Sequence, residues 1–213
     1  MCGIVGILGK GPVAEQLVDA LKRLEYRGYD SAGVATVDNG QLGRRRAEGK
    51  LRNLEELLKR DPLNGDTGIG HTRWATHGKP VEANAHPHMT DLVSVVHNGI
   101  IENFRELREE LAGNGAAFTS DTDTEVIAHL VTHELHAGSD PVRAVFNALK
   151  RLQGAFAVAL IFRGYNDLMI VARQAARWPS ALATARCSSA PMPSRWRPSP
   201  TPSPIWRTAT GRC

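Results

Sequence analysis

Hydrophobic and polar positions follow two periods along most of the chain. Residues 2–9 are apolar and β-branched, which predicts a buried strand close to the N-terminus. Over residues 12–24, Val13, Leu17, Leu21 and Leu24 recur at the spacing of one helix face. Asn39-Gly40 is typical of a type I′ turn and predicts a hairpin between strands at 32–37 and 42–48.

The same patterns continue to residue 172. Further helices are predicted at 51–60, 102–112, 122–135 and 141–152, and further strands at 68–75, 92–101, 155–162 and 168–172. Adjacent pairs of strands alternate with helices. This order favours an α+β fold with layered sheets and outer helices over a doubly wound parallel sheet.

Length and composition place few limits on this interpretation. A chain of 213 residues with 42% apolar residues can build one sizeable core, or a domain with an appendage. The apolar run at 4–8 is too short for a signal peptide, and no apolar stretch approaches the ~20 residues of a membrane span. Cysteines at positions 2, 187 and 213 suggest no disulfide framework, so we expect a cytoplasmic protein and no membrane partner.

The charge separates a tail from the rest of the chain. The formal net charge is +4, yet residues 1–174 contain 20 Lys and Arg against 22 Asp and Glu, whereas residues 175–213 contain six Arg and no acid. The tail also contains seven of the 12 prolines and shows no periodicity, which predicts disorder. We therefore divide the chain into a domain at 1–174 and an aberrant tail at 175–213.

Two interpretations of the tail differ in what they imply. An Arg/Trp arm would bind nucleic acid or a membrane surface. Alternatively, the tail is an out-of-frame translation, since its codons are compatible with a shifted frame that spells an ordinary strand-turn-strand-helix sequence. The second interpretation is favoured, with a frameshift near Gln174, and no nucleic-acid partner is expected.

Cys2 is the strongest candidate for chemistry. Removal of Met1 would leave one residue that carries both a thiol and a free α-amine. The amine has a reference pKa of about 7.7–8, so it can accept the thiol proton near neutral pH, directly or through a water. In isolation, a second-position cysteine is more often a minor packing residue.

Polar and aromatic residues gather in three further places, each at a predicted loop or element end. These are Gly70-His71-Thr72-Arg73-Trp74-Ala75-Thr76-His77-Gly78 with Asn84-Ala85-His86-Pro87-His88, then His97-Asn98-Gly99-Ile100-Ile101-Glu102-Asn103, and Ser120-Asp121-Thr122-Asp123-Thr124-Glu125. Loops and element ends are where binding and catalytic residues concentrate.

These segments, together with Met1-Cys2-Gly3-Ile4-Val5-Gly6 and residues 24–33, closely resemble a known family. It is the glutaminase domain of the glutamine:fructose-6-phosphate aminotransferases (glucosamine-6-phosphate synthases), among the class II glutamine amidotransferases. The resemblance covers residues 1–174. It implies a four-layer αββα N-terminal nucleophile hydrolase sandwich, here incomplete at the C-terminus. It also implies a sugar isomerase domain, absent from this sequence, and a homodimer.

The resemblance and the chemistry assign matching roles to a set of substrate-binding residues. Glutamine is a zwitterion, so its site needs a cation such as Arg73 for the carboxylate and an anion such as Asp123 for the ammonium. Trp74, Thr76 and His77 are expected to form a loop that closes over glutamine. Taken alone, Arg73 is better interpreted as part of a surface ion pair, and Asp123 as an acid that complements a helix N-terminus; the resemblance favours substrate binding for both.

Asn98 and Gly99 are the candidates for the oxyanion hole. Attack by the Cys2 thiolate on the side-chain amide places negative charge on oxygen, and the Asn98 NH₂ and the Gly99 backbone N–H are suitable donors. An Asn-Gly pair is also typical of a hairpin turn, so the resemblance decides between the two roles.

Three remaining positions carry weaker assignments. Arg27 matches an arginine near the nucleophile in the family, with a structural salt bridge as the alternative. His86 and His88 have a spacing that suggests a metal site, but no ligand set accompanies them and the family uses no metal. A hydrogen-bonded structural role is therefore favoured, and the resemblance adds His86 to the substrate-binding residues. No cofactor is expected.

The resulting prediction is a glutaminase that hydrolyses L-glutamine to glutamate and ammonia through a Cys2 thioester. In a complete enzyme of this family, the ammonia would pass to fructose 6-phosphate through the isomerase domain. The alternative is an inactive truncated or frameshifted fragment, since loss of the segment after residue 174 would leave apolar faces and sheet edges uncovered.

Overall fold

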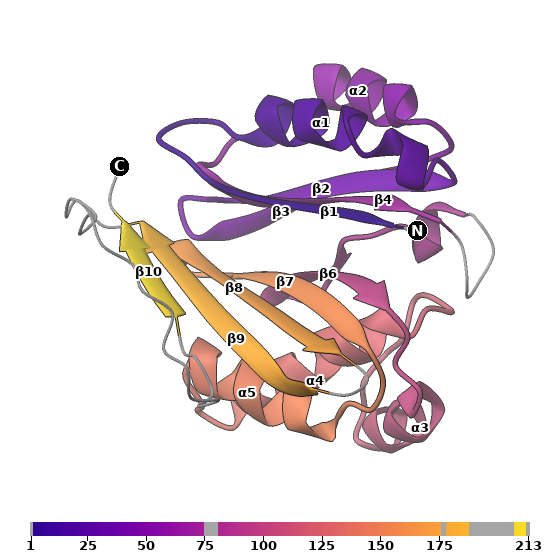
Figure 1. The fold of residues 1–213 in the computed structure, drawn as a ribbon, viewed down its shortest axis with the longest axis vertical. Helices are drawn as coiled ribbons and strands as arrows, with labels where there is room; N and C mark the ends of the chain where they lie inside the picture. The colour runs from indigo at the N-terminus through magenta and orange to yellow at the C-terminus, as the bar shows by residue number, and fades with distance from the viewer. Residues whose placement is uncertain (1, 75–80, 176–177, 188–206, 212–213) are drawn as a thin grey trace.

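The structure is a computed structural model that describes residues 2–74, 81–175, 178–187 and 207–211. Two β-sheets pack face to face, and helices cover the outer face of each sheet (Figure 1). This arrangement confirms the predicted α+β class and its αββα layers.

The first sheet has the strand order β1-β4-β2-β3, and all its pairs are antiparallel. Its strands are β1 (Gly3–Leu8), β2 (Ser31–Asp38), β3 (Gln41–Glu48) and β4 (Thr67–Arg73). Asn39 and Gly40 join β2 to β3 with φ of 48° and 75°, the positive values that a type I′ turn requires, so the predicted hairpin is confirmed. Helices α1 (Ala14–Lys22) and α2 (Leu51–Arg60) cover the outer face, and the short helix η1 (Glu25–Arg27) follows α1.

The second sheet has the order β10-β9-β8-β7-β6-β5. Its strands are β5 (His88–Met89), β6 (Val93–Gly99), β7 (Phe156–Phe162), β8 (Tyr165–Ala175), β9 (Trp178–Cys187) and β10 (Arg207–Gly211). Its outer helices are α3 (Phe104–Gly113), α4 (Thr124–His136) and α5 (Pro141–Arg151), while the short helix η2 (Glu82–Asn84) precedes β5. The predicted elements are all present, and β5 is an addition too short to give a period.

Each strand divides its side chains between two cores because successive residues point to opposite faces. Val34 packs under α1 and α2, whereas its neighbour Ala35 lies between the sheets. In β7, Leu160 faces the helices of the second sheet and Ile161 faces the first sheet. The core between the two sheets fixes their relative position. It therefore determines which strand ends of the first sheet lie close to strand ends of the second sheet.

The prediction of a tail without regular structure is wrong over two segments. β9 pairs antiparallel with β8, and β10 pairs parallel with β9. Without β9, the backbone N–H and C=O groups along one side of β8 would have no strand partner. Backbone pairing does not need an alternating side-chain pattern, which explains why the periodicity did not indicate these strands. The assignment of 175–213 to a separate, out-of-frame tail stays a prediction.

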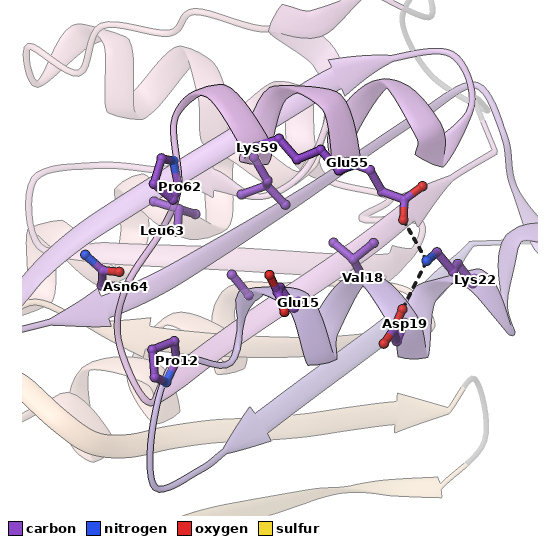
Figure 2. A pocket seen from close by; sticks show the side chains of 12 residues that line it. Pro12, Glu15, Val18, Asp19, Lys22, Glu55, Lys59, Pro62, Leu63 and Asn64 are labelled. Atoms are coloured by element: carbon purple, nitrogen blue, oxygen red, sulfur yellow. Dashed lines mark hydrogen bonds and ion pairs between the residues drawn. The ribbon is translucent and has the colours of Figure 1, made fainter.

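A hollow of about 510 Å³ lies between α1, α2 and the segment at 62–64 (Figure 2). Lys22 lies between the two helices and contacts Asp19 at 3.0 Å and Glu55 at 2.6 Å. This ion pair network joins α1 to α2 on the outer surface of the first sheet. The hollow contains none of the predicted site residues.

Among the described residues, no helix combines the length and the hydropathy required to cross a membrane.

Candidate active site

Cys2 lies one residue before β1, beside the end of β4. The antiparallel register pairs Gly3 with Thr72, which brings Cys2 next to Arg73 and Trp74. The backbone N–H of Trp74 donates to Cys2 Sγ at 3.3 Å, and the thiol donates to the Trp74 carbonyl oxygen at 3.6 Å. The sheet register therefore holds the sulfur between two backbone groups.

A small cavity opens beside the sulfur. Its described lining comes from both sheets and from α4, and consists of Cys2, Arg73, Trp74, His86, His97, Gly99, Thr122, Asp123 and Thr124. Its volume is about 20 Å³, close to the space of a single water.

Asn98 and Gly99 lie at the end of β6, opposite Cys2. The Asn98 side-chain NH₂ donates to the Cys2 backbone carbonyl at 3.1 Å. Gly99 has φ of +138°, and a Cβ at this position would lie 2.2 Å from the Ala155 carbonyl oxygen, so the backbone requires glycine.

The direction of the Gly99 N–H follows from strand pairing. Gly99 is opposite Phe156, and the next residue, Ile100, donates its N–H to Ala155 at 3.2 Å. In an antiparallel pair, hydrogen-bonded positions alternate with positions that are not bonded across that pair. The Gly99 N–H therefore points away from β7.

Arg73 and Asp123 bring opposite charges to the cavity, and both are buried. Asp123 Oδ2 accepts the Ile101 backbone N–H at 2.9 Å, which anchors the carboxylate at the start of α4. Burial lowers the pKa of Arg73, and the negative charges of Cys2, Asp30 and Asp123 oppose that shift. The cavity thus has a cation and an anion within one small volume.

Of the remaining predicted site residues, two line the cavity, and the side chains of the other three are not described by the structure. Trp74 lines the cavity, is 44% exposed and packs edge to face against Tyr29 with 5.6 Å between ring centroids. His86 also lines the cavity. The backbone of Arg27 ends η1, and the structure does not describe its side chain. Thr76 and His77 lie outside the described residues.

Sequence reasoning did not assign a role to His97 and Thr124, which line this cavity, or to His71, which contacts His97. His71 Nε2 donates to the His97 carbonyl oxygen at 3.0 Å, which joins β4 of one sheet to β6 of the other. His97 Nδ1 lies 2.8 Å from Thr124 Oγ1, and His86 Nε2 lies 2.7 Å from the same oxygen. His71, His97 and Thr124 are all in the quoted segments, but their contacts depend on how the sheets pack.

Burial keeps these histidines neutral. Desolvation lowers the pKa of His71 to about 3, and electrostatic repulsion from His97 and Arg73 would act in the same direction, while the hydrogen bond to the His97 carbonyl oxygen opposes the shift. Desolvation also lowers the pKa of His86 well below its usual value, and it lowers the pKa of His97 against the attraction of Asp123. Each ring therefore carries one N–H near pH 7.

Two charged residues anchor the loops that carry the site. Glu125 accepts hydrogen bonds from the backbone and hydroxyl groups of Thr119 and Ser120 at 2.7–2.9 Å. Burial alone would raise the pKa of Glu125, but the His129 side chain and these hydrogen bonds together lower it. Arg46 donates to the carbonyl oxygens of Ala83 and Ala85 at 3.1 and 2.9 Å, which ties the segment before His86 to β3.

Within the described residues, no group of three or more His, Cys, Asp or Glu side chains is arranged to hold a metal ion.

Comparisons with solved structures find the same fold in two enzymes. Glutamine phosphoribosylpyrophosphate amidotransferase from B. subtilis superposes with a TM-score of 0.70 at 26% identity, over 82% of this chain and 37% of that chain. A structure described as the allosteric regulatory enzyme of purine biosynthesis gives a TM-score of 0.70 at 28% identity, with the same coverage.

Curated relatives are closer in sequence. A glutamine--fructose-6-phosphate aminotransferase [isomerizing] of Bradyrhizobium diazoefficiens is 70% identical over 173 residues, which are 81% of this chain and 28% of the relative. The enzyme of the same name from Brucella suis is 64% identical over 174 residues, 82% of this chain and 29% of the relative. The matched part thus spans less than a third of these relatives. The family described as "Glutamine amidotransferase domain" matches residues 71–184, and the chain belongs to this family.

Proposed function

We propose that this chain hydrolyses L-glutamine to glutamate and ammonia, with Cys2 as the nucleophile. The observation that carries the proposal is the convergence of Cys2, Asn98, Arg73 and Asp123 at one end of the two sheets. A sulfur nucleophile, an amide donor and two opposite charges are the groups that an amino-acid amide requires.

Binding is assigned to the charged pair. The Arg73 guanidinium offers parallel N–H groups to the α-carboxylate of glutamine, and Asp123 accepts from the α-ammonium. Because both side chains are buried, their interactions with the ligand are screened less than those of surface charges. Trp74, Thr76, His77, His86 and Arg27 are proposed to complete the substrate site.

The chemical step transfers the glutamine acyl group to sulfur. Once Met1 is removed, the Cys2 α-amine takes the thiol proton, and the sulfur attacks the side-chain amide carbon. The Asn98 NH₂ and the Gly99 N–H stabilise the oxyanion, the C–N bond breaks, and the proton leaves with ammonia. Water then attacks the thioester, which releases glutamate and returns the proton to the thiol.

The test is glutamate release by the purified chain. We expect the wild-type chain to produce glutamate and ammonia in equal amounts from L-glutamine, and Cys2→Ala to produce neither. Cys187→Ala is the matched control, and we expect it to retain activity. Mass spectrometry of the active protein should show a mature N-terminus that begins at an unblocked Cys2. Equal activity of wild type and Cys2→Ala, or activity with Met1 retained, would contradict the mechanism.

The proposal also concerns the larger enzyme in which the glutaminase reaction takes place. In the curated relatives, the name describes an aminotransferase of fructose 6-phosphate, and the chain spans only 28–29% of those relatives. We therefore propose that residues 1–174 supply ammonia in a cytoplasmic, homodimeric enzyme for glucosamine 6-phosphate synthesis, with the sugar bound outside residues 1–213. Adding fructose 6-phosphate to the chain alone should yield no amino sugar.

A further inference from the structure

One buried hydroxyl lies between three polar groups of the cavity wall. Thr124 Oγ1 is 2.7 Å from His86 Nε2, 2.8 Å from His97 Nδ1 and 3.4 Å from Asp123 Oδ1. A hydroxyl has one proton to donate and two lone pairs that accept. It can satisfy three neighbours only if it donates to one of them and accepts from the other two.

The second nitrogen of each histidine ring restricts which neighbour can receive the Thr124 proton. His71 Nδ1, His86 Nδ1 and His97 Nε2 are buried and have no hydrogen-bond partner among the residues that the structure describes. His71 shows the pattern: its Nε2 contacts a carbonyl oxygen, which only accepts, so the proton is on Nε2 and the unpartnered Nδ1 has a lone pair.

The same test applies to each possible direction of the Thr124 proton. If the hydroxyl donates to His86, the proton of His86 moves to Nδ1 and becomes a buried N–H without an acceptor. If it donates to His97, the same happens at His97 Nε2. Buried N–H groups without a partner are rare because each loses its hydration without compensation.

Donation to Asp123 leaves no buried histidine N–H without an acceptor. When the hydroxyl donates to Asp123 Oδ1, His86 Nε2–H and His97 Nδ1–H both donate to the hydroxyl, and the unpartnered nitrogens are lone pairs. The low pKa values of His86 and His97 agree with this arrangement, since each ring then has a single proton. Asp123 accepts at both oxygens, from Thr124 at Oδ1 and from the Ile101 N–H at 2.9 Å at Oδ2.

We propose that Thr124 is a positioning residue for the amino-group site: it accepts the protons of His86 and His97 and directs its own proton to Asp123. The carboxylate is thereby held in the orientation that receives the α-ammonium group of the substrate. This assignment of a substrate group rests on the proposed function, whereas the proton order rests on the contacts alone.

The first experiment compares two substrates that differ in one group. They are L-glutamine and 4-carbamoylbutanoate, which has the same amide and carboxylate but lacks the α-amino group. In Thr124→Val, we expect kcat/KM for L-glutamine to fall roughly tenfold, mainly through KM, because the Asp123 carboxylate loses the hydroxyl donor that orients it. The kcat/KM for 4-carbamoylbutanoate should fall much less, because this substrate has no ammonium group for Asp123 to receive, and Thr124→Ser should restore the preference.

Thr132→Val is the matched control, since Thr132 is on the same helix and its hydroxyl contacts Thr90 Oγ1 at 2.6 Å, away from the cavity. It should leave the ratio between the two substrates unchanged. An equal loss for both substrates in Thr124→Val, or no loss for L-glutamine, would overturn the positioning role.

The second experiment reads the proton order in the unmodified chain. Nitrogen-15 NMR of the histidine rings near pH 7 should place the proton of His86 on Nε2, that of His97 on Nδ1 and that of His71 on Nε2. A proton on His86 Nδ1 or on His97 Nε2 would refute the proposal whether or not the chain is active. A wild-type chain without glutaminase activity would refute the proposed function and leave the proton order to this measurement.

Discussion

The backbone N–H of Trp74 lies 3.3 Å from Cys2 Sγ, across a separation of 72 residues in sequence. The contact follows from the antiparallel pairing of β1 with β4, because Gly3, the residue after Cys2, is opposite Thr72, and β4 ends one residue before Trp74. The candidate nucleophile is therefore positioned by a sheet. A sheet defines a reacting atom more precisely than a loop does.

Removal of the Asn98 amide should slow the reaction without preventing folding. In Asn98→Ala, we expect kcat to fall about 10²–10³-fold, the usual cost of losing one oxyanion donor. Steady-state kinetics with L-glutamine measures the effect. Asn103→Ala is the matched control because the Asn103 NH₂ also donates to a backbone carbonyl, that of Arg151 at 2.9 Å, but Asn103 is not among the residues that line the cavity. A similar loss of kcat in both variants would show that Asn98 acts only on stability.

Gly99 should tolerate no side chain. Gly99→Ala places a Cβ 2.2 Å from the Ala155 carbonyl oxygen and strains a backbone with φ of +138°. We expect a loss of about 1–3 kcal/mol in the free energy of unfolding together with a strong loss of activity. Gly113→Ala, at the end of α3 with nothing near the added Cβ, should leave both quantities nearly unchanged. Denaturant unfolding and kinetics of the two variants test this contrast.

Arg73→Lys should raise KM for L-glutamine at least tenfold, with a smaller effect on kcat. Lysine keeps the positive charge but loses the fork of N–H groups that binds a carboxylate in two places. Arg163→Lys changes an exposed arginine in the same way and should have no effect on KM. Unchanged KM in Arg73→Lys would remove Arg73 from the substrate site.

The sequence predicted those parts of the molecule whose structure is determined by residues close together in the chain. The period of apolar residues predicted α1, α2, α5 and the buried strands, because each element must bury one face. At Asn39-Gly40 the turn was predictable because few residue pairs accept two positive φ values. Cys2, Asn98, Arg73 and Asp123 were found from residue motifs, and the structure brings them to one cavity or to contact with its nucleophile.

What the sequence did not predict depends on distant packing. The contact between His71 and His97 exists because β4 and β6 lie in different sheets that face each other, and no local pattern encodes it. Thr124 resembled any residue at the start of a helix until two histidines were found within 2.8 Å of its hydroxyl. β9 and β10 were missed because backbone pairing with a neighbouring strand needs no alternation of side chains.

The nucleotide sequence around codon 174 should contain one inserted or deleted base. This expectation rests on the change in composition after Gln174, since residues 175–213 contain six Arg and no acid. The high-identity relatives also match over 173–174 residues of the 213. Resequencing the gene is the measurement, and a corrected frame should restore a protein closer to the relatives in length. A confirmed, unchanged reading frame would establish residues 175–213 as a true product.

Acid should destabilise this fold earlier than it does most proteins, because four histidines are buried. Burial lowers the pKa of His71 and His88 to about 3 and lowers those of His86 and His97 in the same direction. The unfolded chain, with histidine pKa values near 6.5, then binds more protons than the folded chain below that pH. For His71 and His88, the stability that the neutral rings permit is complete above about pH 6.5 and is lost as the pH falls toward 3, by about 1.4 kcal/mol per pH unit for each ring. His86 and His97 change the stability in the same direction.

Denaturant unfolding between pH 7.5 and 4.5 measures this slope, and one variant isolates a single histidine. His88 contacts Thr122 Oγ1 at 2.9 Å and is not among the residues that line the cavity, so His88→Gln should reduce the slope by one proton per molecule, whatever it does to stability at pH 7.5. His136→Gln changes an exposed histidine and should leave the slope unchanged. If both variants keep the wild-type slope, His88 titrates alike in the folded and unfolded chains, and its burial does not cause the sensitivity to acid.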